Sequence, residues 1–182
     1  MDNARLRQLG AGIMAATLAH GTAIGATQGS LGTTSTGSIS IGATVANRVQ
    51  ISGLSDVSFT NQDPGTPAAN AQNLCVWSNT STKGYNVTAT GSGAASAFTL
   101  ANGGSTVPYS VEWAGTSGQS SGTALLTGSA LTGLTSTATN ATCSSGPGSS
   151  ASLIVKISTA NLQSMQAAAS YTGTLTLVVA PE

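Results

Sequence analysis

Apolar and polar residues alternate along residues 38–45, a short stretch with the sequence SISIGATV. In an extended chain, side chains two residues apart lie on the same face. The pattern therefore predicts a β-strand with four apolar side chains on one face: Ile39, Ile41, Ala43 and Val45.

Shorter alternating runs follow at regular intervals along the rest of the chain. They lie at residues 48–54, 57–60, 74–78, 85–90, 98–100, 107–113, 153–158 and 171–179, with Gly, Ser, Asn and Pro clusters between them. Asn102-Gly103-Gly104 is a typical hairpin signal, because Asn and Gly tolerate positive φ angles. Only residues 161–169 suggest a short helical turn. About seven strands after Asn47 predict an all-β, immunoglobulin-like sandwich.

The predicted sandwich has one edge without a partner. The last strand, residues 171–179, carries a long apolar face, and an exposed hydrophobic edge of a sheet promotes aggregation unless it is covered. Residues 38–45 have matching length and parity, and they follow a Gly/Ser/Thr-rich segment, residues 27–37. We therefore expect an incomplete sandwich that is completed by donor-strand exchange, in which residues 38–45 of one copy fill the gap in its neighbour.

Composition supports a folded protein that does not bind nucleic acid. Charged residues make up 5% of the 182 residues and the net charge is zero, while hydrophobic residues reach 40%. Clustered β-branched residues argue against disorder. Phosphate binding needs clustered Lys and Arg, whereas Arg48, Lys83 and Lys156 are scattered along the sequence.

The N-terminal 26 residues have the pattern of a secretory signal peptide. Arg5 and Arg7 precede an apolar stretch that ends near Ala19, and small residues follow as far as Ala26. A membrane anchor is the alternative, but the apolar run is shorter than the roughly 20 residues that a span needs. The expected organisation is a leader (1–26), an N-terminal extension with the donor strand (27–46) and one domain (47–182).

Export would place the two cysteines, Cys75 and Cys143, in an oxidising compartment, where one intramolecular disulfide is expected. Two free buried thiols are the alternative. Closing a loop of almost 70 residues would stabilise the fold by about 4 kcal/mol.

Catalytic residue types are scarce in the expected mature chain, so we predict that it is not an enzyme and needs no cofactor or metal. The one histidine, His20, lies in the predicted leader, which leaves no Ser-His-Asp or Cys-His pair. Asp56, Asp63 and Glu112 are interpreted as surface charges rather than as a glycosidase pair. The aromatic residues could stack on sugars, but the parity of Tyr85, Tyr109, Trp113 and Tyr171 favours core packing; Trp77 is left open.

Three segments of the sequence resemble chaperone-usher pilins. They are ISIGATVANRVQISGL at residues 39–54, VPYSVEWAG at 107–115 and SYTGTLTLVVAPE at 170–182. The chain is most similar to fimbrial subunits of the alpha type and to relatives of the spore coat protein U group. Two cysteines far apart in the sequence depart from the usual patterns of that family, in which a disulfide links the first two strands or is missing.

The resemblance implies a pilus subunit that polymerises with copies of itself. A periplasmic chaperone and an outer-membrane usher would be its assembly partners, and the fibre would lie outside the cell and support adhesion to host or abiotic surfaces or biofilm formation. Ile39, Ile41, Ala43 and Val45 would be the donor side chains. The acceptor groove would be formed by Val49, Ile51, Leu175, Leu177 and Val179.

Two other functions remain open from the sequence. One is a tip adhesin or a secreted sugar-binding module with the same fold. The other is a self-contained secreted sandwich that folds its own N-terminal strand into its groove.

Overall fold

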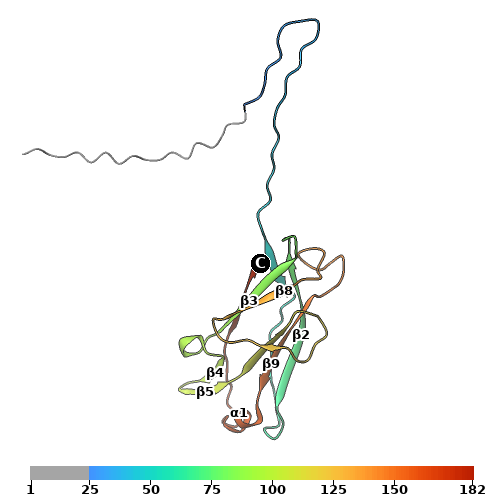
Figure 1. Ribbon diagram of the computed structural model, residues 1–182. Coiled ribbons are helices and arrows are strands. Elements are labelled where there is room, and N and C mark those ends of the chain that lie inside the picture. The colour runs from blue at the N-terminus through green and yellow to red at the C-terminus, as the bar shows by residue number, and fades with distance from the viewer. Residues whose placement is uncertain (1–24) are drawn as a thin grey trace, which may run out of the picture. The chain divides into compact units, whose positions relative to one another are not determined.

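The computed structural model describes residues 25–182 and divides the chain into two units, the second of which is Ala46–Glu182 (Figure 1). The described part of the first unit, residues 25–45, contains one isolated bridge, Thr27 with Ser38, and no longer strand. The predicted strand at residues 38–45 is therefore not formed there, since a strand needs a ladder partner. Most of the predicted leader lies outside the described residues.

The second unit is built from antiparallel strands, which confirms the all-β prediction. One sheet has five strands in the order β1 (Val49–Ser52), β2 (Ala68–Ser78), β9 (Ala151–Ile157), β6 (Ser110–Ala114) and β7 (Thr123–Ala124). The other has three, β10 (Leu175–Pro181), β3 (Gly84–Gly91) and β8 (Ala130–Thr135). A hairpin of β4 (Thr99–Asn102) and β5 (Ser105–Pro108), the 3-10 turn η1 (Ala94–Ser96) and the helix α1 (Thr159–Gln163) complete the described elements.

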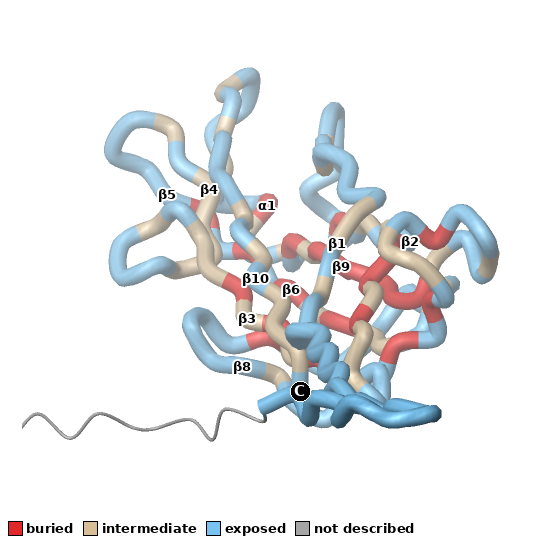
Figure 2. Tube along the Cα trace, turned by 90° about the horizontal axis from the view of Figure 1, so that it is seen from above, coloured by how far each residue is buried: buried red, intermediate tan, exposed pale blue. Residues whose placement is uncertain are grey.

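The two larger sheets share one hydrophobic core. Alternate residues of each strand point into it, and the buried members are red in Figure 2: Leu74 and Val76 of β2, Tyr85, Val87 and Ala89 of β3, Val111 and Trp113 of β6, and Leu153, Val155 and Ile157 of β9. Trp113 meets Tyr85 edge-on across the core, with ring centroids 6.4 Å apart, and its Nε1–H donates to the Tyr85 hydroxyl at 3.3 Å. Burial raises the pKa of Tyr85 despite that opposing bond.

Several predicted boundaries were wrong because pairing partners were not visible in the sequence. β2 starts at Ala68 instead of residue 74, since its first half pairs with β9. The predicted strand at 107–113 is two strands, β5 and β6, which pair with β4 and β9 respectively. The last strand starts at Leu175, because Thr172 pairs with Ala101 of β4 instead. The hairpin turn consists of Gly103 and Gly104, and Gly103 has φ +55°.

A disulfide joins Cys75 of β2 to Cys143, which confirms the predicted pairing. Cys143 belongs to a loop that runs from residue 136 to residue 150 and is held to β2 at both ends. The Ser136 hydroxyl donates to the Val76 carbonyl, and the Ser150 hydroxyl accepts from the Val76 N–H at 2.8 Å. Trp77 packs partly buried against the disulfide. The loop therefore covers one end of β2 as a second, smaller cluster.

The ion pair of Glu112 and Lys156 is expected to make a small, pH-dependent contribution to stability. The Lys156 Nζ donates to both carboxylate oxygens, at 2.7 and 2.8 Å, and this bond is the main reason that the pKa of Glu112 is lowered. A carboxylate whose pKa is lowered by folding stabilises the folded state at pH values above its pKa in the unfolded chain, which is near 4.3. This stabilisation is lost as the pH falls through the pKa of the folded state. Glu112→Gln should therefore lose less than about 1 kcal/mol at pH 7.

Urea unfolding at pH 7 and pH 3 measures the loss of stability in Glu112→Gln. Lys156→Met and the double variant complete a double-mutant cycle, which isolates the interaction between the two side chains. The deficit of Glu112→Gln should shrink at pH 3. A deficit of equal size at both pH values would contradict the ion-pair origin.

Candidate functional site

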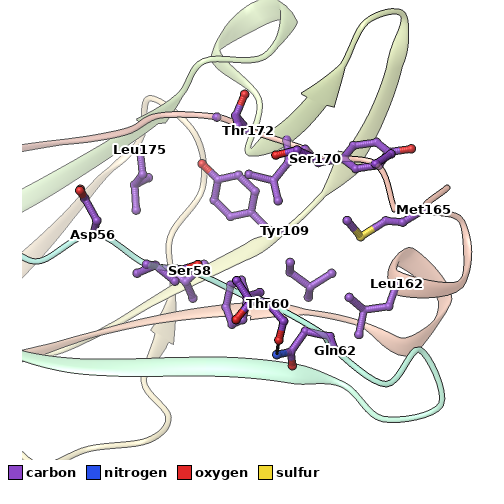
Figure 3. Close-up of a pocket in the computed structure, with 18 of the residues that line it drawn as sticks. Asp56, Ser58, Thr60, Gln62, Tyr109, Leu162, Met165, Ser170, Thr172 and Leu175 are labelled. Atoms are coloured by element: carbon purple, nitrogen blue, oxygen red, sulfur yellow. Dashed lines mark hydrogen bonds between the residues drawn. The ribbon is translucent and has the colours of Figure 1, made fainter. Parts of the chain in front are cut away.

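A groove opens along one side of the two-sheet unit, where each sheet ends in an edge strand. β1 is the edge of the five-stranded sheet and β10 is the edge of the three-stranded sheet, and the two strands contact each other. Beyond that contact the walls separate, and the cavity between them has a volume of about 1250 Å³ (Figure 3). A long opening between two sheet edges is the place where a further strand can join both sheets.

The first wall is residues 54–62, which we call the wall segment. Gly53, with φ +80°, turns the chain at the end of β1, and Val57 and Phe59 then pack partly buried against the core while Ser58 and Thr60 are exposed. This alternation is that of a strand, and a strand was predicted at 57–60. The structure has none there, because no backbone–backbone hydrogen bond within residues 25–182 involves the main chain of the wall segment. The Ser55 N–H and carbonyl bond to the Gln72 side chain, and the Thr60 carbonyl accepts from the Gln62 side chain. The other main-chain groups of the wall segment make no hydrogen bond within residues 25–182.

The second wall is β10 with the residues that precede it. Leu175 and Leu177 line the groove. Val178, which follows Leu177, faces outward and is 57% exposed. β10 pairs with β3 along one edge, and in the described part of the chain the other edge has no strand. The wall segment and β10 therefore both present main-chain groups that have no strand partner to the same cavity.

The floor of the groove is apolar. Three of its residues belong to β9, one to β4, one lies between β5 and β6, and two lie in or just after α1. They are Leu153, Val155, Ile157, Leu100, Tyr109, Leu162 and Met165. Asp56 is the one charged residue among the described residues that line it. Burial raises the pKa of Tyr109, so its hydroxyl remains neutral at physiological pH. Figure 3 shows this hydroxyl pointing into the groove.

The structure places the predicted groove residues in two sets. Leu175 and Leu177 line the groove. Val49, Ile51 and Val179 are partly buried against the same core but are not among the lining residues, since they lie on β1 and the far part of β10. Sequence reasoning missed the wall segment and the Leu162–Met165 end of the groove. The parity of Val57 and Phe59 was the available signal for the wall.

The predicted donor residues belong to the separate N-terminal unit. Ile39, Ile41 and Val45 are 73%, 87% and 83% exposed, and Ala43 is exposed as well. Large apolar side chains in a regular row are rarely left in water unless another surface covers them. The donor role itself stays a prediction.

The three internal acids have separate surroundings. Glu112 binds Lys156, and the Asp63 carboxylate accepts from the N–H of Gly65 at 2.8 Å within a turn, whereas Asp56 lines the groove. Within residues 25–182, no three His, Cys, Asp or Glu residues are grouped so that they could hold a metal ion. In the same part of the chain, no helix has the length and apolar character to cross a membrane.

Comparison with known proteins gives distant structural similarities alone. No family model and no curated protein matches the chain. Among solved structures, a chain from a chaperone-tip adhesin complex connected with the biogenesis of CFA/I fimbriae matches with 16% identity and a TM-score of 0.47. The match covers 75% of this chain and 41% of that chain, so our chain spans less than half of the length of its neighbour. No family follows from a similarity at this level.

Proposed function

We propose that this protein is a structural subunit of an extracellular fibre that assembles by strand addition. Residues 38–45 of one copy would lie in the groove of the next, between the wall segment and β10. The observation that carries the proposal is a groove with an apolar floor, which has the free edge of β10 on one side and the extended wall segment, with most of its main chain not hydrogen-bonded, on the other. An incoming strand would bond to those edges through its main chain and fill the groove through alternate side chains, which is a known mode of peptide recognition.

The dimensions of donor and groove agree. Eight extended residues span about 26 Å, and the nine residues of the wall segment span about 30 Å when extended. Burial of Ile39, Ile41, Ala43 and Val45 would contribute roughly 5 to 8 kcal/mol before the cost of ordering the strand. The absence of charge in residues 38–45 suits a groove whose described lining has a single carboxylate.

The proposed subunit works without catalysis, and its partners are those that the sequence resemblance implies. Copies of the same chain would form the fibre, a periplasmic chaperone would cover the groove before assembly, and an outer-membrane usher would be the site of exchange. The Cys75–Cys143 disulfide agrees with passage through an oxidising compartment. The product would be a pilus on the cell surface.

Electrophoresis of the purified assembled protein tests this proposal. A strand that is part of the core of its neighbour leaves only when that core unfolds. Samples in SDS at room temperature should therefore run as a ladder of multimers that collapses to monomer on boiling. Monomer alone in the unheated lane would contradict assembly by strand addition.

A further inference from the structure

Gln72 occupies an inward-facing position of β2 where an apolar residue is expected. It shares its face with Leu74 and Val76, which are buried in the core, and it lines the groove. Gln72 is partly buried, and an amide that loses contact with water is costly unless its donor and its acceptor find other partners. The hydrogen-bond partners of the Gln72 amide therefore explain why glutamine fits this position.

Both ends of the Gln72 amide bond to the backbone of Ser55, at the start of the wall segment. Its Oε1 accepts from the Ser55 N–H at 2.8 Å, and its Nε2 donates to the Ser55 carbonyl at 3.1 Å. This is the pattern by which a strand residue would bond to a neighbouring strand. Here a side chain replaces the strand.

The register of β1 and β2 explains why these residues meet. The pairs run from Val49 with Ser78 to Ser52 with Cys75. Three further steps would place Ser55 opposite Gln72, but the ladder ends when Gly53 turns the chain away at φ +80°. The Gln72 side chain then spans the gap, so the two backbones are separated by the length of a side chain instead of the strand spacing of about 4.8 Å.

We propose that Gln72 is a positioning residue that holds the wall segment away from β2 and so keeps the groove open for an incoming strand. The inference rests on the function proposed above. Gly53 ends the β1–β2 ladder, and the Gln72 amide then satisfies the backbone of Ser55, so that Ser55 does not pair with the main chain of β2. The wall segment beyond it keeps its main chain free for the strand of the next copy.

Gln72→Glu in the full-length chain tests this role, because its effect depends on pH. An ionised carboxylate can accept from the Ser55 N–H but cannot donate to the Ser55 carbonyl, whereas a protonated acid does both. Formation of SDS-resistant multimers should be slower by about tenfold at pH 7 and should return to within about twofold of wild type at pH 4. Gln50→Glu, at an exposed position of β1, is the matched control and should follow wild type at both pH values. Asp56, the neighbour of Ser55 in the groove lining, is present in all three proteins.

Hydrogen exchange of the Ser55 amide measures the bond between Ser55 and Gln72 in the unassembled protein. Its protection should fall in Gln72→Glu at pH 7 and recover at pH 4, while Gln50→Glu keeps it. Normal assembly of a folded Gln72→Glu at pH 7, or an equal defect at both pH values, would overturn the role of Gln72. A wild-type chain that never forms multimers would contradict the proposed function instead, whatever the Ser55 amide shows.

Discussion

Ile41→Asp is expected to abolish the SDS-resistant multimers of the full-length chain. Ile41 is 87% exposed in its own N-terminal unit, so the substitution removes no contact of the domain core. In the proposed fibre the same side chain enters an apolar groove, where an unpaired carboxylate is costly. We expect multimers to decrease by about 100-fold or more in gels of unheated samples.

Ser40→Asp is the matched control for this experiment. It places the same charge one residue away, on the opposite face of the predicted strand, where side chains would point to solvent. It should assemble nearly as well as wild type. Equal losses in both variants would show that charge in the extension, and not the fit of one face, decides assembly.

Mixing donor-deficient and groove-deficient chains tests the direction of assembly. Leu177→Asp, checked for folding by circular dichroism, should close the groove to an incoming strand while leaving residues 38–45 intact. Ile41→Asp should keep an open groove. A head-to-tail interface of two different surfaces predicts that neither variant forms multimers alone and that their mixture stops at a dimer. Longer ladders from the mixture would contradict one donor and one groove per chain.

The strands of the core could be predicted because their side chains alternate between core and solvent. Tyr85, Val87 and Ala89 are all buried, while the residues between them are not, so the period of two was already visible in the sequence. The same reasoning placed Tyr109 and Trp113 inside. It also found both cysteines of the disulfide, since two cysteines allow a single intramolecular pairing.

The role of the wall segment could not be predicted, because parity says which side chains face inward but not what covers them. Tyr109 was expected as a core residue, and it is buried, yet it lines the groove. Gln72 has the appearance of an ordinary polar strand residue, and its partner Ser55 is 17 positions away. Only the register of β1 and β2 brings the two together, and register depends on tertiary pairing.

Removing the disulfide is expected to lower the free energy of unfolding by about 4 kcal/mol. The Cys75–Cys143 link closes a loop with a sequence separation of 68, and the chain-entropy model gives about this value for such a loop. Urea unfolding of Cys75→Ala/Cys143→Ala against wild type measures the loss. Wild type in a reducing agent is the control, because it keeps both sulfur atoms in the core and loses only the link. A reduced wild type that remains within about 1 kcal/mol of the oxidised protein would contradict the estimate.

The same double variant separates stability from assembly. Neither cysteine is among the residues that line the groove, and the wall segment is held by Gln72, Gly53 and its own apolar side chains. At a temperature where the variant is still folded, we therefore expect it to form SDS-resistant multimers, and these should collapse to monomer at a lower temperature than those of wild type. Failure of the folded variant to assemble would mean that the loop at residues 136–150, tied to β2 by the disulfide, also positions the groove, because β2 carries both Cys75 and Gln72.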